Sequence, residues 1–302
     1  MGDQGRTWLG VVAISFSAIL VRLADVEPVR SAFLRGAYAL PAFAVLAVIV
    51  RRRDPEPLFV PMAVLAGAAL GVDLLAWHVA IAHLGAGLAT VLPNVQVFLV
   101  GVIGVMLFRE RPLPMFWLAF PVTLVGVTLL ALGGRPVIVG GSIGFGVAAG
   151  LLTAAAYAAY LVLLRLARLR RPTAGSVAVV GSATLGATAV MAVVAGFEGV
   201  AAPPPGFAAN AWLVVLALGC QVGGWLLLGS SIHRLPAALT SVALLLQPLL
   251  TIVWGALLLD EDIGAVQFAG AAVVLGSVFL AHRAVVLGSR RTAEAEAVAP
   301  VT

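Results

Sequence analysis

The residues of this sequence that could do chemistry are a few polar and aromatic side chains set inside long apolar runs. Asp73 lies in the segment GVDLLAW, near the middle of such a run. If the run is a membrane helix, an ionised carboxylate at its centre costs about 2.5–3.5 kcal/mol of insertion free energy. Carboxylates kept at that depth face a polar cavity and mark proton or substrate pathways, or they form a structural bond between helices. We expect coupling or substrate contact for Asp73, with the structural bond as the alternative.

Two further ionisable residues, Arg35 and His78, are candidates to act together with Asp73. Arg35 is four or five residues inside another apolar run. Its side chain either snorkels to the membrane surface or faces a cavity, where it would pair with Asp73 or with an anionic group of a substrate. His78 lies about 140° from Asp73 around a helix, so the two do not share a face. We expect His78 at the membrane interface or in a helix contact.

Amides and aromatic residues complete the candidate set. Gln96 and Gln247 lie inside apolar runs, where an amide must either bridge helices or line a substrate path, while Asn94 is expected to point elsewhere. Tyr157 and Tyr160 are three residues apart and share a helix face, which suits a cavity wall or core packing. Trp77 and Trp225 either line the same cavity or anchor their helices at the membrane interface.

The composition places these residues in an integral membrane protein. Of the 302 residues, 62% are hydrophobic and 10% are charged, and the mean hydropathy is +1.12. Soluble domains are about 45–50% apolar and about 25% charged. The net charge of +5 comes from 18 arginines with no lysine. The arginines lie in short segments between apolar runs, which indicates membrane topology rather than nucleic-acid binding.

A membrane-spanning helix needs about 20 apolar residues, and ten runs of about this length are present. The first run could instead be a cleaved signal peptide, but no small-x-small cleavage site precedes Arg22. The fold class we predict is therefore all-α and polytopic. The expected helices span residues 8–24, 31–50, 60–82, 86–107, 114–133, 141–164, 174–196, 211–232, 237–259 and 264–285.

The distribution of arginines predicts that both termini are cytoplasmic. With the N-terminus inside, most arginines fall in cytoplasmic segments, whereas the acidic triplet at 260–262 falls outside. Residues 286–302 lack apolar periodicity and are predicted to be a disordered cytoplasmic tail. The glycine pairs 67/71, 140/144, 146/150 and 219/223, each spaced four apart, predict close helix contacts.

An internal repeat divides the chain into two five-helix units. GVDLLAW at 71–77 corresponds to GCQVGGW at 219–225, so Gln221 takes the place of Asp73 and Trp225 that of Trp77. Gln96 corresponds to Gln247, and RER at 109–111 to DED at 260–262. An odd number of helices in each unit threads the second unit through the membrane in the opposite sense. Such inverted repeats are characteristic of secondary transporters, with substrate held near the midplane between them.

Ten helices in two such repeats resemble an EamA-type permease of the drug/metabolite transporter superfamily. The segments that carry the resemblance are NVQVFLVGVIGVMLFRERPLPMFWLAFPVTLVGV and LLQPLLTIVWGALLLDEDIGAVQFAGAAVVLGSV. The units are 8–135 and 136–285. The resemblance implies an exporter or exchanger of a small metabolite, amino acid or drug in the cell (plasma) membrane, driven by protons and working by alternating access. The family often has a proline after Gln247, which Pro248 supplies; the first unit has Val97 there, although Pro93 lies nearby.

Other functional classes lack the residues they would need. HExxH, GxSxG and P-loop motifs are absent, the four histidines are scattered and Cys220 is the single cysteine. We therefore expect no enzyme activity, no cofactor, no metal and no nucleic-acid partner. The partners we expect are a small solute, protons and the lipid bilayer, with a monomer and a homodimer both open. The alternatives to transport are an intramembrane lipid-modifying enzyme and a non-transporting scaffold.

Overall fold

The computed structural model describes residues 2–53, 59–108, 113–133, 141–231, 237–261 and 263–298. All regular structure in these ranges is helical. The elements are α1 (Asp3–Ser15), α2 (Ser17–Ala24), α3 (Pro28–Arg53), α4 (Pro61–Leu84), α5 (Ala86–Val91), η1 (Leu92–Val95), α6 (Gln96–Phe108), α7 (Pro114–Gly133), α8 (Ile143–Arg170), α9 (Ser176–Phe197), α10 (Phe207–Val215), η2 (Leu216–Gly224), α11 (Trp225–Ser231), α12 (Ala237–Leu258) and α13 (Ala265–Val298).

Each of the ten predicted runs coincides with helical structure. Within the described residues, eight helical segments are long and apolar enough to cross a membrane, and Pro114–Leu129 and Leu246–Leu258 are shorter apolar helices. The chain is therefore a polytopic membrane protein. Helix α13 continues past residue 285 to Val298, which differs from the disordered tail expected over 286–302. Alanine, glutamate and arginine in this segment have high helix propensity, which explains the continuation.

Three of the membrane segments are not uniform α-helices. The first is interrupted at Phe16, between α1 and α2. The fourth contains the 3₁₀ turn η1, which begins beside Pro93, a residue that cannot donate a backbone hydrogen bond. The eighth contains η2, a nine-residue π-helix. Pro248, in contrast, lies within a continuous α12, so only the first unit has an irregular turn near its proline.

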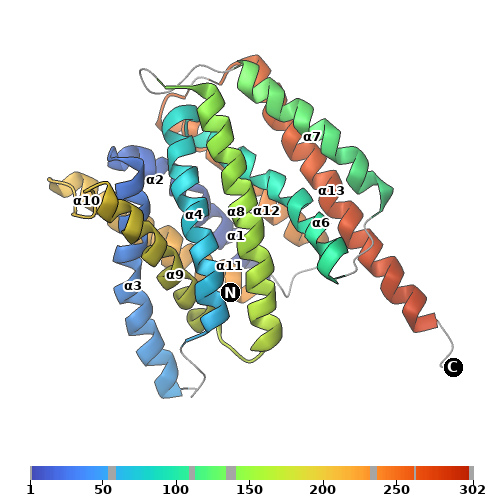
Figure 1. Ribbon diagram of the computed structural model, residues 1–302, viewed down its shortest axis with the longest axis horizontal. Helices are drawn as coiled ribbons and strands as arrows, with labels where there is room; N and C mark the ends of the chain where they lie inside the picture. Colours follow the sequence, from blue (N-terminus) through green and yellow to red (C-terminus); the bar gives the residue numbers. More distant parts are fainter. Residues whose placement is uncertain are drawn as a thin grey trace.

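Helix α4 is the centre of the bundle and packs extensively against α8 and α9. Helices α7 and α13 pack against each other at the right of the bundle in Figure 1, on the far side of α8 from α4. Glycines allow the α4–α9 contact. A Cβ on Gly67 would overlap the Ala183 carbonyl, and a Cβ on Gly186 would overlap the Val64 carbonyl. The two backbones therefore touch directly, as small-residue interfaces in membranes allow.

The predicted glycine pairs differ in what they contact. Gly67 and Gly71 pack against α9, and Gly146 and Gly150 pack against side chains of residues 83, 84 and 92. The prediction was wrong for Gly219 and Gly223, because no atom of another helix in the described part of the chain lies within 4 Å of a Cβ built at either position of the π-helix. A Cβ at Gly144 would meet the Ser142 hydroxyl at 3.8 Å and no atom of another described helix, and residue 140 lies outside the described ranges.

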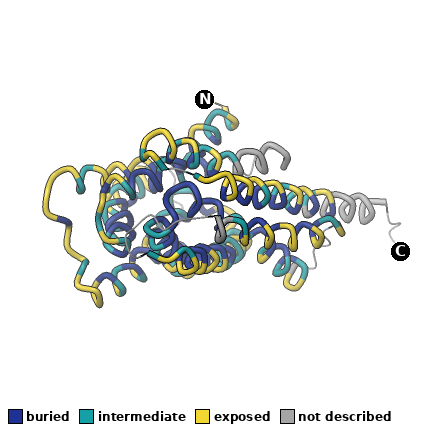
Figure 2. Tube along the Cα trace, turned by 90° about the horizontal axis from the view of Figure 1, so that it is seen from above, coloured by how far each residue is buried: buried dark blue, intermediate teal, exposed yellow. Residues whose placement is uncertain are grey.

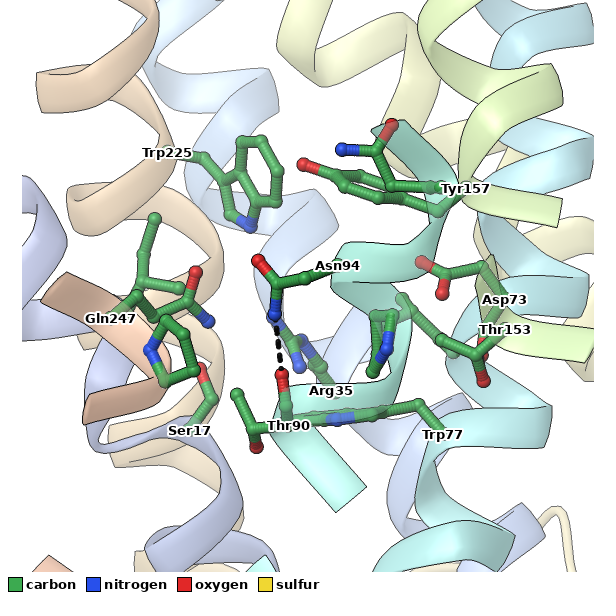
Figure 3. A pocket seen from close by; sticks show the side chains of 15 residues that line it. Ser17, Arg35, Asp73, Trp77, Thr90, Asn94, Thr153, Tyr157, Trp225 and Gln247 are labelled. Carbon is green, nitrogen blue, oxygen red and sulfur yellow. Dashed lines mark hydrogen bonds between the residues drawn. The ribbon is translucent and has the colours of Figure 1, made fainter. Parts of the chain in front are cut away.

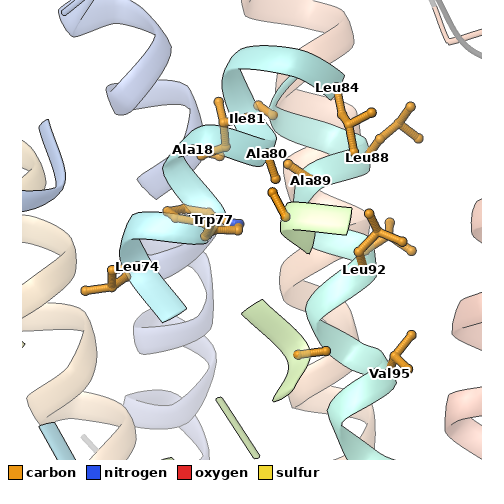
Figure 4. Close-up of a cluster of buried hydrophobic side chains, with 14 of the residues drawn as sticks. Ala18, Leu74, Trp77, Ala80, Ile81, Leu84, Leu88, Ala89, Leu92 and Val95 are labelled. Carbon is orange, nitrogen blue, oxygen red and sulfur yellow. The ribbon is translucent and has the colours of Figure 1, made fainter. Parts of the chain in front are cut away.

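The buried core runs along the inner faces of the helices, whereas many large apolar side chains face outward. Figure 4 shows part of the core, where Trp77, Ile81, Leu84 and Leu88 pack at the junction of α4 and α5. Exposed residues lie on the outer sides of the bundle (Figure 2), and they include Leu118, at 70% exposure. Apolar side chains on the outside suit contact with lipid.

The two ends of the bundle carry different sets of connections. Residues 25–30, 83–86, 198–209 and 259–261 gather at the end that we call the Gly85 end, and in Figure 1 the segment leading into α10 lies at the left of this end. Residues 60–65 and 167–171 meet at the opposite end, which we call the Arg170 end. Helix α4 connects the two and, with 24 residues, is about 36 Å long.

Candidate functional site

A pocket of about 100 Å³ lies in the middle of the bundle, between α2, α3, α4, η1, α8, α11 and α12 (Figure 3). It contains most candidates from the sequence, whereas Gln221, His78 and Tyr160 do not line it. Its lining residues are Ile14, Ser17, Arg35, Asp73, Leu74, Trp77, Thr90, Pro93, Asn94, Gln96, Thr153, Tyr157, Trp225, Gln247 and Pro248. Residues more than 200 positions apart in the sequence thus meet at one polar cavity inside an apolar bundle.

Asp73 supplies the negative charge of the pocket from the middle of α4. Its side chain is 6% exposed. The hydroxyl of Thr153 donates to the backbone carbonyl of Asp73 at 3.3 Å, and no hydrogen bond or ion pair to the carboxylate is present among the described residues. The structural bond between helices, the alternative reading of Asp73, is therefore not observed for the carboxylate within these ranges.

Arg35 supplies the positive charge from α3 and faces the pocket instead of snorkelling to the surface. Its Nε donates to Gln221 Oε1 at 2.8 Å, and Gln221 Nε2 donates to Thr184 Oγ1 at 3.1 Å. Arg35 Nη1 is buried without a hydrogen-bond partner in the described structure. No ion pair between Arg35 and Asp73 is present among the residues that the structure describes, and the Nε donor is used by Gln221 instead. Gln221 lies behind Arg35 and does not line the pocket.

Three amides face the pocket from the first and second halves of the chain. Asn94 Nδ2 donates to the carbonyls of Thr90 and Val91, both at 3.0 Å, and Figure 3 shows its amide oxygen directed away from these bonds, toward Trp225. The expectation that Asn94 points away from Gln96 was wrong, since the 3₁₀ turn changes the angular spacing that an α-helix would impose. Gln96 Oε1 is buried without a hydrogen-bond partner among the described residues.

Aromatic rings form the apolar walls of the pocket. Tyr157 lines it and stacks on Tyr160, with the ring centroids 5.8 Å apart. Trp77 lies on one side and Trp225 on another, and the Arg35 guanidinium carbon is 5.8 Å from the Trp77 ring centroid. Both tryptophans therefore belong to the pocket and do not act as interface anchors.

A second cavity, of about 800 Å³, opens at the Gly85 end and carries charges of both signs. Arg22, Asp25, Glu198 and His83 line it, together with His78. The side chain of His78 is 1% exposed, and its Nδ1 lies 2.7 Å from the Leu74 carbonyl. His78 therefore faces a different cavity from Asp73, in agreement with their separation around α4, and it is buried rather than interfacial.

A carboxylate from the second half of the chain caps a helix of the first half at the Gly85 end. Glu261 Oε1 accepts from the Ala86 backbone N–H at 2.6 Å, and Oε2 accepts from Gly87 N–H at 3.1 Å. Gly85 has φ +85°, and a Cβ there would lie 2.7 Å from Glu261 Oε1. Both the conformation and the close approach require glycine at this position.

Sequence reasoning missed the small hydroxyl residues of the pocket. Ser17, Thr90 and Thr153 line it, but serine and threonine are common in membrane helices because their hydroxyls can bond to their own helix, as Thr90 does to the Ala86 carbonyl. Residue type alone therefore did not mark them. Trp225 was recognised through the repeat, whereas Pro93 was noted only as a potential helix break.

A comparison with protein families decides what kind of protein this pocket belongs to. Residues 144–283 match the model of the EamA-like transporter family. This stretch of the second half of the chain is therefore similar to an EamA domain. The family match confirms the resemblance found in the sequence, and together with the membrane-spanning helices it makes the protein a membrane transporter.

The fold of this chain also recurs among solved structures. One of them, titled only as the crystal structure of a protein, superposes with a TM-score of 0.61 at 17% sequence identity, covering 96% of this chain and 98% of the other. At this identity the likeness shows the fold alone. A search of curated proteins found no significant match.

Proposed function

We propose that this protein is a secondary transporter that exports a small zwitterionic metabolite across the cell membrane by proton-coupled alternating access. The observation that carries the proposal is the presence of one carboxylate, Asp73, and one guanidinium, Arg35, in the same buried pocket without a salt bridge between them. Burying two charges is costly unless each finds a partner. A solute with an ammonium and a carboxylate group would supply both partners.

The size of the pocket selects among the solutes that the family resemblance implies. Drug-sized ligands occupy pockets of roughly 300–1,000 Å³, whereas this pocket has a volume of about 100 Å³. The pocket therefore favours a compact metabolite of the size of a small amino acid over a bulky drug. The amides of Asn94, Gln96 and Gln247 would complete its hydrogen bonds.

Alternating access is supported by contacts that join the two halves at opposite ends of the bundle. Glu261 caps α5 at the Gly85 end. Leu113 N–H, just before α7, donates to the Ala284 carbonyl at 3.2 Å, which is about 30 Å along α13 from its start at Ala265. Leu113, just before α7, and Glu261, just before α13, thus lie at opposite ends of α13, which supports the inverted repeat that we propose. In the topology we propose, the Gly85 end faces outward.

Proton coupling is assigned to Asp73 because a membrane carboxylate without a bound cation is a proton acceptor. In this scheme a proton from the outer side and the ammonium group of the solute compete for the same carboxylate. Protonation of Asp73 releases the solute outward, and return of the proton to the cytoplasm restores the binding form. Gln221, the corresponding residue of the second unit, cannot titrate, so a single carboxylate carries the coupling.

The test is solute flux in proteoliposomes with an imposed pH gradient. Thermal stabilisation of the purified protein by a panel of amino acids, nucleosides and small cations first identifies a solute that binds. A coupled transporter accumulates that solute against its own gradient, and the accumulation collapses when a protonophore is added. Flux that only dissipates the solute gradient contradicts coupling, and the absence of any flux contradicts transport.

A further inference from the structure

In the second unit, the residue that corresponds to Asp73 is an amide, Gln221. The geometry of the pocket alone does not explain this difference between the two units. Gln221 is 3% exposed and lies in the π-helix η2, where it contacts Arg35 of α3 and Thr184 of α9. π-Helical turns often occur at functional sites. Gln221 thus joins three membrane segments directly behind the guanidinium.

The hydrogen bonds fix the orientation of the Gln221 amide. Thr184 Oγ1 accepts from Nε2 at 3.1 Å, which leaves Oε1 to accept from Arg35 Nε at 2.8 Å. If the amide were reversed, its NH₂ group would face the Arg35 N–H and two donors would meet. Arg35, whose guanidinium has only donors, therefore selects the orientation in which Oε1 faces Nε, and the Thr184 hydroxyl, at 1% exposure, accepts from the Nε2 end of the same amide.

The neutrality of Gln221 has an electrostatic consequence. A carboxylate at position 221 could accept the same hydrogen bond from Arg35 Nε, but it would also neutralise the positive charge in a medium of low dielectric constant. An amide satisfies the Nε donor without adding a second negative charge beside the guanidinium. Arg35 Nη1 remains without a partner among the described residues, so the guanidinium keeps both charge and donor capacity for another acceptor.

We infer that Thr184 and Gln221 form a neutral clamp that positions the Arg35 guanidinium and reserves its positive charge for the carboxylate of the transported solute. Gln221 and Thr184 are positioning residues, because they act through Arg35 and do not line the pocket. This inference rests on the proposed zwitterion site and adds the part of the site that sets its preference for an anionic group.

Three small probe molecules distinguish binding to the positive charge of the site from binding to its negative charge. L-Alanine carries both an ammonium and a carboxylate, propionate lacks the ammonium, and ethylamine lacks the carboxylate. Each is titrated against purified protein in detergent, and its apparent Kd is taken from the rise in Tm. For Gln221→Glu we expect the Kd of L-alanine and of propionate to rise at least about tenfold, the scale of one hydrogen bond to a charged group. The Kd of ethylamine should not rise.

Controls separate positioning from a general effect of a new buried acid. Gln267→Glu makes the same change at a residue that is 5% exposed on α13, where the side chain accepts from Gly264 N–H and does not contact Arg35; its probe affinities should equal those of the wild type. If Gln221→Glu does not fold, Thr184→Val replaces it and should weaken propionate binding, whereas Thr184→Ser should restore it.

The outcomes distinguish this inference from the proposed function. Wild-type protein that binds the probes, with an unchanged propionate Kd in Gln221→Glu and in Thr184→Val, contradicts the clamp alone. Wild-type protein that is stabilised by none of the three probes contradicts the zwitterion site and the clamp with it. Selective loss of L-alanine and propionate binding in the variants supports both.

Discussion

Arg35 and Asp73 line the same buried pocket, yet the guanidinium donates to Gln221 and not to the Asp73 carboxylate. In a structural ion pair the two side chains would neutralise each other and leave few charges and hydrogen-bonding groups for a ligand. Here each charge keeps capacity for a partner from outside the protein. This relationship is the basis for assigning a zwitterionic solute, and it makes the two residues separable by mutation.

Asp73→Asn should abolish accumulation against a gradient, whereas solute exchange should persist at raised solute concentration, because the amide oxygen can still accept a hydrogen bond from the ammonium group of the solute. Asparagine preserves the size and the hydrogen-bonding capacity of the side chain but cannot load or release a proton. Proteoliposomes containing the variant should show solute counterflow without uphill uptake in a pH gradient. The matched control is Asp25→Asn, an exposed carboxylate in the cavity at the Gly85 end, which should retain uphill uptake. Unimpaired uphill transport by Asp73→Asn would rule out its coupling role.

Glu261→Gln should open the Gly85 end of the bundle more often. The carboxylate receives two backbone N–H bonds from α5, and loss of a helix cap of this kind costs about 1–2 kcal/mol, or roughly 5- to 30-fold in an equilibrium. A Ser17→Cys reporter in the pocket, in a Cys220→Ala background, should therefore react faster with a membrane-impermeant maleimide added from that side.

The neighbouring acid provides the control for this experiment. Asp260 is exposed and has φ +50°, a conformation that asparagine also tolerates, and within the described residues the N–H groups at the start of α5 donate to Glu261 and not to Asp260. Asp260→Asn should leave the labelling rate of the reporter unchanged. Equal rates for Glu261→Gln and the wild type would show that the cap does not hold this end closed.

Gly67→Ala should destabilise the fold, whereas Gly276→Ala should not. A methyl group at residue 67 would overlap the Ala183 carbonyl, and overpacking of this kind costs about 1–3 kcal/mol. No atom lies within 4 Å of a Cβ at residue 276, so alanine there should be neutral or stabilise α13 by roughly 0.5–1 kcal/mol. Thermal unfolding in detergent measures both, and similar Tm values for the two variants would argue against direct α4–α9 backbone contact.

The sequence predicted the helices well because the length and hydropathy of an apolar run are sufficient to locate a membrane segment. It did not predict the irregular turns at Phe16, at η1 and at η2, since hydropathy does not determine whether a backbone N–H donates to the carbonyl three, four or five residues earlier. The 3₁₀ turn is the reason that Asn94 was misplaced. Hydrophobic length likewise could not show that α13 would continue to Val298.

The sequence predicted which residues belong to the candidate site, but it did not predict which hydrogen bonds they form. Asp73, Arg35 and the amides stood out because polar groups inside hydrocarbon are costly and therefore few. Which of them would pair depended on the packing of α3 against η2 and α9, which brings Gln221 to Arg35. That contact joins residues 186 positions apart, and no local pattern in the sequence encodes it.

The most direct measurement concerns the sidedness of two corresponding connections in the repeats. Single cysteines at Arg109 and at Asp260, each in the Cys220→Ala background, are labelled with an impermeant maleimide in intact cells and in inverted vesicles. Two oppositely threaded halves around the Asp73 pocket predict that residue 260 reacts only from outside and residue 109 only from the cytoplasm. Labelling of both positions from the same side would contradict the inverted arrangement and the alternating-access mechanism that depends on it.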